Sequence, residues 1–80
     1  MVLHEGDSAV LVCDLADCGL KRGDVGTVVL VHKSKGYEVE FMTLDGETLT
    51  VASLARDQVR AIRRREIAHV RAVESAAPRS

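Results

Sequence analysis

Two cysteines and three histidines are the side chains best suited to bind a metal ion. Cys13 and Cys18 are spaced as C-x4-C, whereas zinc sites use C-x2-C pairs or a second pair of ligands. His4, His32 and His69 have no ligand spacing relative to each other. We therefore expect two reduced thiols, as in a reducing cytosol, with no metal and no other cofactor.

Two glutamates and one cysteine are the side chains that could serve as catalytic groups. Glu38 and Glu40 stand two residues apart, and paired acids do acid–base chemistry when a cleft desolvates one of them. On the outer face of a strand they are expected to be solvated instead. Cys18 would need an activating base to act as a nucleophile, and none is near in sequence. We therefore expect a protein that is not an enzyme.

The densest basic cluster is formed by Arg60, Arg63, Arg64 and Arg65. Residues 1–55 carry nine acids and four bases, a net charge of −5, and residues 56–80 carry three acids and seven bases, a net charge of +4. Two interpretations stay open. The basic end complements the acidic body, within one molecule or between copies, or it binds an acidic partner or nucleic acid.

The elements that position these groups begin with residues 19–31, a glycine-rich turn followed by an apolar run. Gly23 and Gly26 suit a positive φ or a close approach of two backbones. Asp24 between them suits a turn, because its carboxylate can accept hydrogen bonds from nearby N–H groups. Gly23, Asp24 and Gly26 are therefore predicted to form a structural turn that starts a strand.

Five short apolar runs predict a mainly β chain. The clearest is residues 37–41, where Tyr37, Val39 and Phe41 alternate with glutamates. Asp45-Gly46 is a strong hairpin signal. The predicted strands cover residues 8–13, 25–32, 37–41, 47–52 and 59–62.

The connections complete the predicted architecture. Residues 14–21 read as a long loop whose Leu15 and Leu20 fold back onto the core, and Ser53 reads as the cap of a helical turn over residues 54–57. Five short strands with regular turn signals predict a small five-stranded SH3-like barrel over residues 1–62, because closure removes exposed sheet edges.

Residues 63–80 are predicted to form a helical extension, with an amphipathic α-helix over residues 63–76. Its apolar stripe would combine Ile62, Glu66, Val70, Val73 and Ala77, with Ile67 at the margin and Arg64 and Arg71 opposite. A helix of about four turns is marginal alone in water, so we expect it to dock on its own barrel, a second copy or a partner. The predicted partner-binding residues are Arg63, Arg64, Ile67, Val70, Arg71 and Val73.

Several motifs occur in an order that resembles a known family. They are Gly6-Asp7, Leu15, GLKRGDVGTVV at 19–29, YEVEF at 37–41, DGET at 45–48 and DQV at 57–59. Over residues 5–62 the chain resembles a family of small bacterial proteins catalogued as a domain of unknown function. The resemblance implies an SH3-like barrel. It also implies an antitoxin-like or immunity-like role, because many members are encoded beside toxin-like genes. The C-terminal helix is not covered.

A second resemblance concerns the turn alone. Residues 23–31 resemble the KOW-like motif of translation and transcription factor barrels that bind RNA or ribosomal protein, and also the barrel of nitrile hydratase small subunits. Both share the Gly-x-x-Gly-x-Val pattern, which recurs for backbone reasons.

Two function classes follow. We expect first a protein-interaction module that binds a protein partner or a second copy through the C-terminal helix. The alternative is a nucleic-acid-binding barrel with a basic tail, placed second because Tyr37 and Phe41 are the sole aromatic residues for base stacking. No apolar run reaches the roughly 18 residues that span a membrane, and no secretory signal follows Met1. A cytoplasmic protein without membrane contact is therefore expected.

Overall fold

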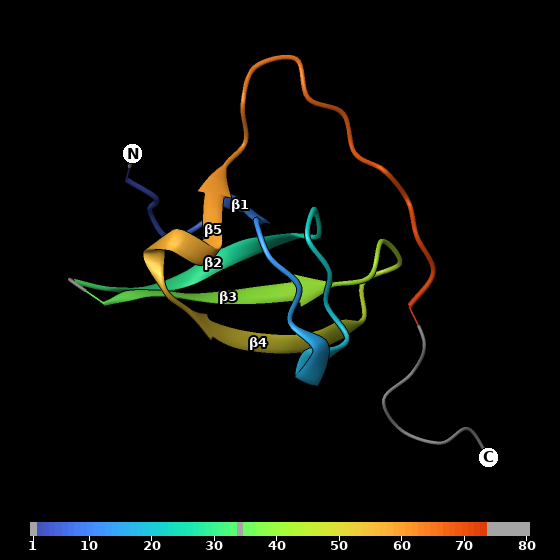
Figure 1. The fold of residues 1–80 in the computed structure, drawn as a ribbon, viewed down its shortest axis with the longest axis horizontal. Coiled ribbons are helices and arrows are strands. Elements are labelled where there is room, and N and C mark those ends of the chain that lie inside the picture. Colours follow the sequence, from blue (N-terminus) through green and yellow to red (C-terminus); the bar gives the residue numbers. More distant parts are fainter. Residues whose placement is uncertain (1, 34, 74–80) are drawn as a thin grey trace.

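Alternating apolar and polar side chains build a five-stranded antiparallel sheet in a computed structural model that describes residues 2–33 and 35–73 (Figure 1). The prediction of a mainly β fold is confirmed. The strands are β1 (Ser8–Leu11), β2 (Val25–His32), β3 (Gly36–Met42), β4 (Thr48–Leu54) and β5 (Val59–Ala61). Two short 3-10 helices, η1 (Ala16–Cys18) and η2 (Arg56–Gln58), lie in the connections. None of the helices in the described residues is long or apolar enough to cross a membrane.

The predicted closed barrel is wrong, because the strand order is β4-β3-β2-β1-β5 and places β4 and β5 at opposite ends of the sheet. β5 contains three residues and pairs with β1 through Ala9↔Ala61 and Leu11↔Val59. So short a strand leaves little length for a second ladder with β4. Figure 1 shows the short β5 beside β1, running in a different direction from β2, β3 and β4, so the sheet curls but stays open.

The core lies on the concave side of this curled sheet and follows the alternation on β3. Tyr37, Val39 and Phe41 are buried, while Glu38 and Glu40 face outward. Burying such side chains is the main source of stability in a domain of this size. Within the described residues, the buried apolar side chains are Leu3, Ala9, Val10, Leu11, Leu20, Val28, Tyr37, Val39, Phe41, Ala52, Leu54 and Val59.

Two connections beside the core were predicted from the sequence, the loop over residues 14–21 and the helical turn over residues 54–57, and only the first agrees with the structure. Leu20 is buried, Leu15 packs against the core, and the two form an isolated bridge, as expected for residues 14–21. The helical turn predicted over residues 54–57 is wrong in position, since η2 covers Arg56–Gln58. Ser53 is no cap, because it lies in β4 and its hydroxyl donates to Glu38.

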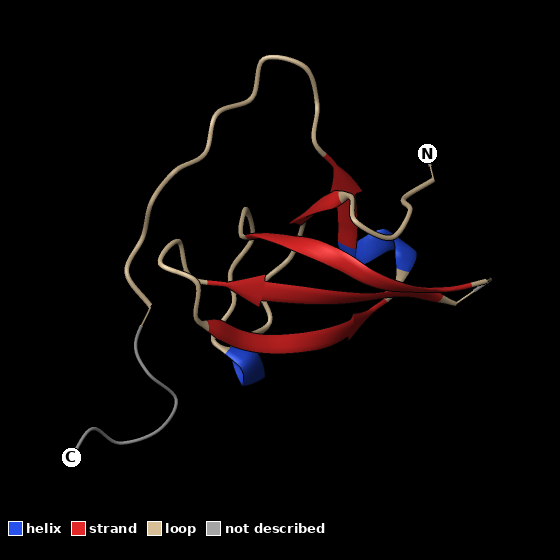
Figure 2. Ribbon diagram, turned by 180° about the vertical axis from the view of Figure 1, so that it is seen from behind, coloured by secondary structure: helices blue, strands red, loops and turns tan. Residues whose placement is uncertain are grey.

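The predicted C-terminal helix is also wrong. Residues 62–73, called the C-terminal segment below, contain no helix, and residues 74–80 lie outside the described part of the chain. Arg65 has a φ of +64°, which a right-handed helix cannot hold. Arginines at 63, 64 and 65 would also oppose the dipole at a helix N-terminus. Figure 2 shows the segment leaving β5 and arching away from the sheet.

Candidate functional site

The turn at residues 21–24 is fixed to the end of β1 by backbone hydrogen bonds. Gly23 has a φ of +95° and donates to Leu11 O at 2.8 Å, while Leu11 donates to Asp24 O at 2.9 Å. The Asp24 carboxylate accepts from the Lys21 N–H at 2.8 Å, and Asp14 accepts from the Arg22 N–H at 2.8 Å. The predicted turn chemistry of Asp24 is therefore visible in its own loop.

Gly26 is required for a different reason than Gly23. It lies in β2, and a Cβ atom there would stand 2.6 Å from Val39 Cγ1 and 2.7 Å from Glu40 O. Such distances are shorter than real Cβ contacts, so β2 and β3 can approach only because this residue has no side chain. Both glycines thus serve the architecture of the sheet.

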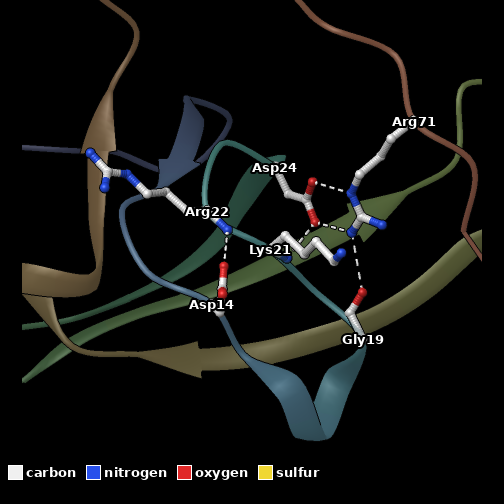
Figure 3. A network of polar contacts seen from close by, with 6 residues as sticks. All are labelled: Asp14, Gly19, Lys21, Arg22, Asp24 and Arg71. Carbon is white, nitrogen blue, oxygen red and sulfur yellow. Dashed lines mark hydrogen bonds and ion pairs between the residues drawn. The ribbon is translucent and has the colours of Figure 1, made fainter.

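The same Asp24 carboxylate binds an arginine 47 residues away (Figure 3). Arg71 Nε donates to Oδ1 at 2.8 Å, and Arg71 Nη2 donates to Oδ2 at 2.5 Å and to Gly19 O at 3.1 Å. The side chains of Asp24 and Arg71 are 17% and 29% exposed. This partly buried, bidentate ion pair connects the C-terminal segment to the turn at residues 21–24. Figure 3 shows the Arg22 side chain pointing the other way.

Charge around this contact keeps both partners ionised. Desolvation acts to raise the pKa of Asp24, but hydrogen bonds from Arg71 and from the Lys21 backbone, with the charges of both residues, outweigh it and lower the pKa below its usual value. The hydrogen bond to Asp24 raises the pKa of Arg71 further. The pair therefore persists throughout the neutral range.

A second ion pair shapes the start of the C-terminal segment. Arg60 Nη1 and Nη2 donate to the two carboxylate oxygens of Glu66 at 2.9 and 2.7 Å, and the Arg63 N–H donates to Glu66 Oε1. The hydrogen bonds from Arg60, and then from Arg63, lower the pKa of Glu66 to about 2. Together they close a turn that carries Arg64 and Arg65 at its tip.

The residues predicted to bind a partner fall into two groups. Arg71 contacts Asp24. The sequence could not indicate this contact, because an uneven charge distribution does not specify which acid pairs with which base. Ile67 and Val70 are 94% and 71% exposed. Arg63 and Arg64 are exposed as well, and Val73 stands at the margin of exposure.

Sequence reasoning missed two residues of this site, Glu66 and Gly19. Glu66 was assigned to an apolar helix face, although its position six residues after Arg60 was a signal for a local ion pair once the helix is set aside. Gly19 contributes only its carbonyl oxygen, for which no side-chain signal exists.

His32, Glu38 and Ser53 form a polar cluster on the outer face of the sheet. His32 Nε2 lies 2.8 Å from Glu38 Oε2, and Ser53 Oγ donates to that same oxygen at 2.6 Å. The hydrogen bond from Ser53, followed by that of His32, lowers the pKa of Glu38. Because serine and histidine share one acceptor, the histidine does not stand where it would take the serine proton.

The possible metal ligands stay apart within residues 2–33 and 35–73. Cys13 and Cys18 are free thiols there, the second exposed. That part of the chain holds no group of three histidine, cysteine, aspartate or glutamate side chains arranged to bind a metal ion.

Comparison with known proteins adds one finding. A family model described as a domain of unknown function (DUF4926) matches residues 5–61. No curated protein and no solved structure matches the chain. The match covers all five strands and Asp24 and stops before the C-terminal segment. The region that the family model matches therefore ends before the segment that Arg71 ties to it.

Proposed function

Because the chain belongs to the DUF4926 family, whose description assigns no function, we propose a function from the molecule's own features. We propose a cytoplasmic, non-enzymatic protein-interaction module, in which an SH3-like arrangement of strands carries the C-terminal segment as its binding element. The observation behind this proposal is the exposure of Ile67 and Val70 on a stretch held at both ends by ion pairs. The ligand is a protein partner or a second copy of the chain.

Physical reasons favour the stretch between the two ion pairs. Covering exposed apolar side chains removes their surface from water, which favours association. The pairs Arg60–Glu66 and Arg71–Asp24 fix residues 66 and 71, which limits the conformations open to the four residues between them. A segment restricted in this way loses less entropy on binding than a free tail does.

The biological role follows from the family resemblance rather than from a contact. Members encoded beside toxin-like genes suggest an antitoxin-like or immunity-like role, with the product of the neighbouring gene as the protein partner. Co-purification of that product with the full chain supports this role, and its absence from the bound fraction at micromolar concentrations contradicts it.

Nucleic-acid binding is a second candidate, favoured by the exposed turn with Arg63, Arg64 and Arg65. Each phosphate neutralised by an arginine makes binding steeply salt-dependent. Arg60 and Arg71 are already paired with carboxylates, which reduces the charge available to phosphates. Titration of RNA and DNA duplexes at low salt tests it, and an absence of binding there excludes this candidate.

The main proposal is tested with the full chain carrying Ile67→Asp and Val70→Asp. Leu44→Asp is a matched control, because Leu44 is 90% exposed but lies in the β3–β4 connection. Light scattering and partner capture should show that association is lost in the variant with Ile67→Asp and Val70→Asp and kept in Leu44→Asp. Equal association of the wild-type chain and both variants would contradict the proposal.

A further inference from the structure

An open groove runs between η1 with its preceding loop and β4. Its volume is about 550 Å³. One wall is made of residues 14–18, including Asp14, Leu15 and Asp17, and the other of residues 51–54, with Gln58 at one end. Two aspartates and no basic side chain line it, so the groove is acidic over an apolar floor.

The second wall of this groove is also an edge of the sheet. The strand order places β4 last, after β3. Val51 lies on this edge, 51% exposed, and lines the groove. The edge of a sheet offers backbone N–H and C=O groups to an additional strand, which is a common way of binding an extended peptide.

The groove therefore suits a particular kind of occupant, which is an extended segment with apolar side chains and positive charge. The described chain contains such a segment in residues 62–73. It is non-helical, Ile67 and Val70 are exposed, and Arg64 and Arg65 stand on the turn just before them. The net charges of −5 over residues 1–55 and +4 over residues 56–80 are complementary between copies.

We propose that this groove and the β4 edge bind the C-terminal segment of a second copy of the chain. Residues 67–70 add to β4. Side chains three positions apart in a strand face opposite sides of the sheet, so Ile67 packs over Val51 while Val70 covers the other side of the β4 edge, and Arg64 and Arg65 face Asp17. The exchange is mutual, so that each copy gives its segment and receives the other, which is the self-complementary geometry of a two-fold dimer. This inference rests on the proposed function and names its partner.

A charge swap in the full chain tests the proposal. Asp17 is exposed, and Asp17→Lys reverses the charge at this position and cancels the remaining charge of Asp14, while Arg64→Glu with Arg65→Glu reverses the charge at the tip of the turn. Each change alone should raise the dimer dissociation constant about tenfold, and the three together should restore it. Glu5→Lys is the control, since it changes the net charge equally at an exposed site that does not line the groove. Sedimentation equilibrium measures the dimer dissociation constant of each variant, and thermal melting curves confirm that each variant is folded.

The outcomes separate this inference from the proposed function. The groove is the wrong receptor if Asp17→Lys and Glu5→Lys weaken the dimer equally, or if the variant with all three charge changes still dimerises weakly. In either case, loss of association in the variant with Ile67→Asp and Val70→Asp would still support the C-terminal segment as the binding element. If the full chain is monomeric at every concentration, the second copy is the wrong occupant, and capture of another protein then decides the proposed function.

Discussion

In the sheet, Val39 and Phe41 are 0% and 2% exposed, whereas in the C-terminal segment Ile67 and Val70 are 94% and 71% exposed. Strand β3 is held from both sides by neighbouring strands and by the core beneath it. The segment is held by Arg60–Glu66 and Arg71–Asp24. Similar apolar residue types thus have opposite environments in the two regions.

Because of this difference, the sheet accounts for the stability of the fold, and the C-terminal segment is the element proposed to bind. Apolar burial depends weakly on salt and pH, whereas partly exposed ion pairs are screened by salt and lost when a carboxylate is protonated. We therefore expect the sheet to stay folded when these pairs are weakened. A partner can cover Ile67 and Val70 while both pairs stay in place.

The largest effect is expected from Phe41→Ala, which removes a buried ring from the core of the sheet. The free energy of unfolding should fall by about 3–5 kcal/mol, as for other truncations of buried aromatic residues. Met42→Ala is the matched control on the same strand, because Met42 is 47% exposed. Urea denaturation measures both, and a similar loss in the two variants would contradict the core described above.

Substitutions of Gly23, in the turn before β2, and of Gly26, within β2, test the description of the sheet. Gly26→Val should lower the free energy of unfolding by about 1–3 kcal/mol through overpacking against Val39 and Glu40. Gly23→Val should lower it by about 1–2 kcal/mol, because a β-branched residue is strained at positive φ. Thermal melts check both values. Wild-type melting temperatures in both variants would show that the turn is wrongly described.

A smaller effect is expected where the two regions meet. Arg71→Gln removes the pair with Asp24 but leaves the Lys21 N–H bonded to that carboxylate. The pair is partly exposed, so unfolding should change by no more than about 1 kcal/mol. NMR relaxation of the backbone amides should nevertheless show larger motions within residues 62–73 and no change in β1 to β5. Larger motions in the strands would mean that the segment supports the fold.

The smallest effect concerns the pH dependence of the Arg60–Glu66 ion pair. The pKa of Glu66 is lowered from 4.5 to about 2, so its pair with Arg60 stabilises the turn fully above pH 4.5 and is lost as pH falls through about 2. An NMR titration of the Glu66 carboxyl carbon should give this low midpoint. In Arg60→Gln, the midpoint should return towards 4.5, and an unchanged midpoint would contradict the pair.

Much of the sheet was predictable because its signals are local. The alternation of Tyr37, Val39 and Phe41 with glutamates, and the Asp45-Gly46 turn, each involve neighbours in sequence. The open edge of the sheet was harder to predict, because barrel closure depends on the length of β5 and on its pairing with β1. These are properties of distant strands that no local pattern specifies.

The C-terminal segment shows why part of the site was not predictable. A helical wheel grouped Glu66 with Val70 and Val73, but the wheel cannot weigh a side chain that pairs with Arg60 and closes a turn. Asp24 and Arg71 were each singled out, for unrelated reasons. Their contact spans 47 positions and depends on the path of the whole chain.

Residue-resolved hydrogen exchange of the full chain, recorded at low and at high protein concentration, tests the separation of sheet and segment most directly. We expect protection of residues 62–73 and of β4 to increase with concentration, because the segment of one copy covers the edge of another. Protection of β1, β2 and β3 should stay the same. Protection independent of concentration along the whole chain would contradict the assignment of the segment as the element that binds a second copy.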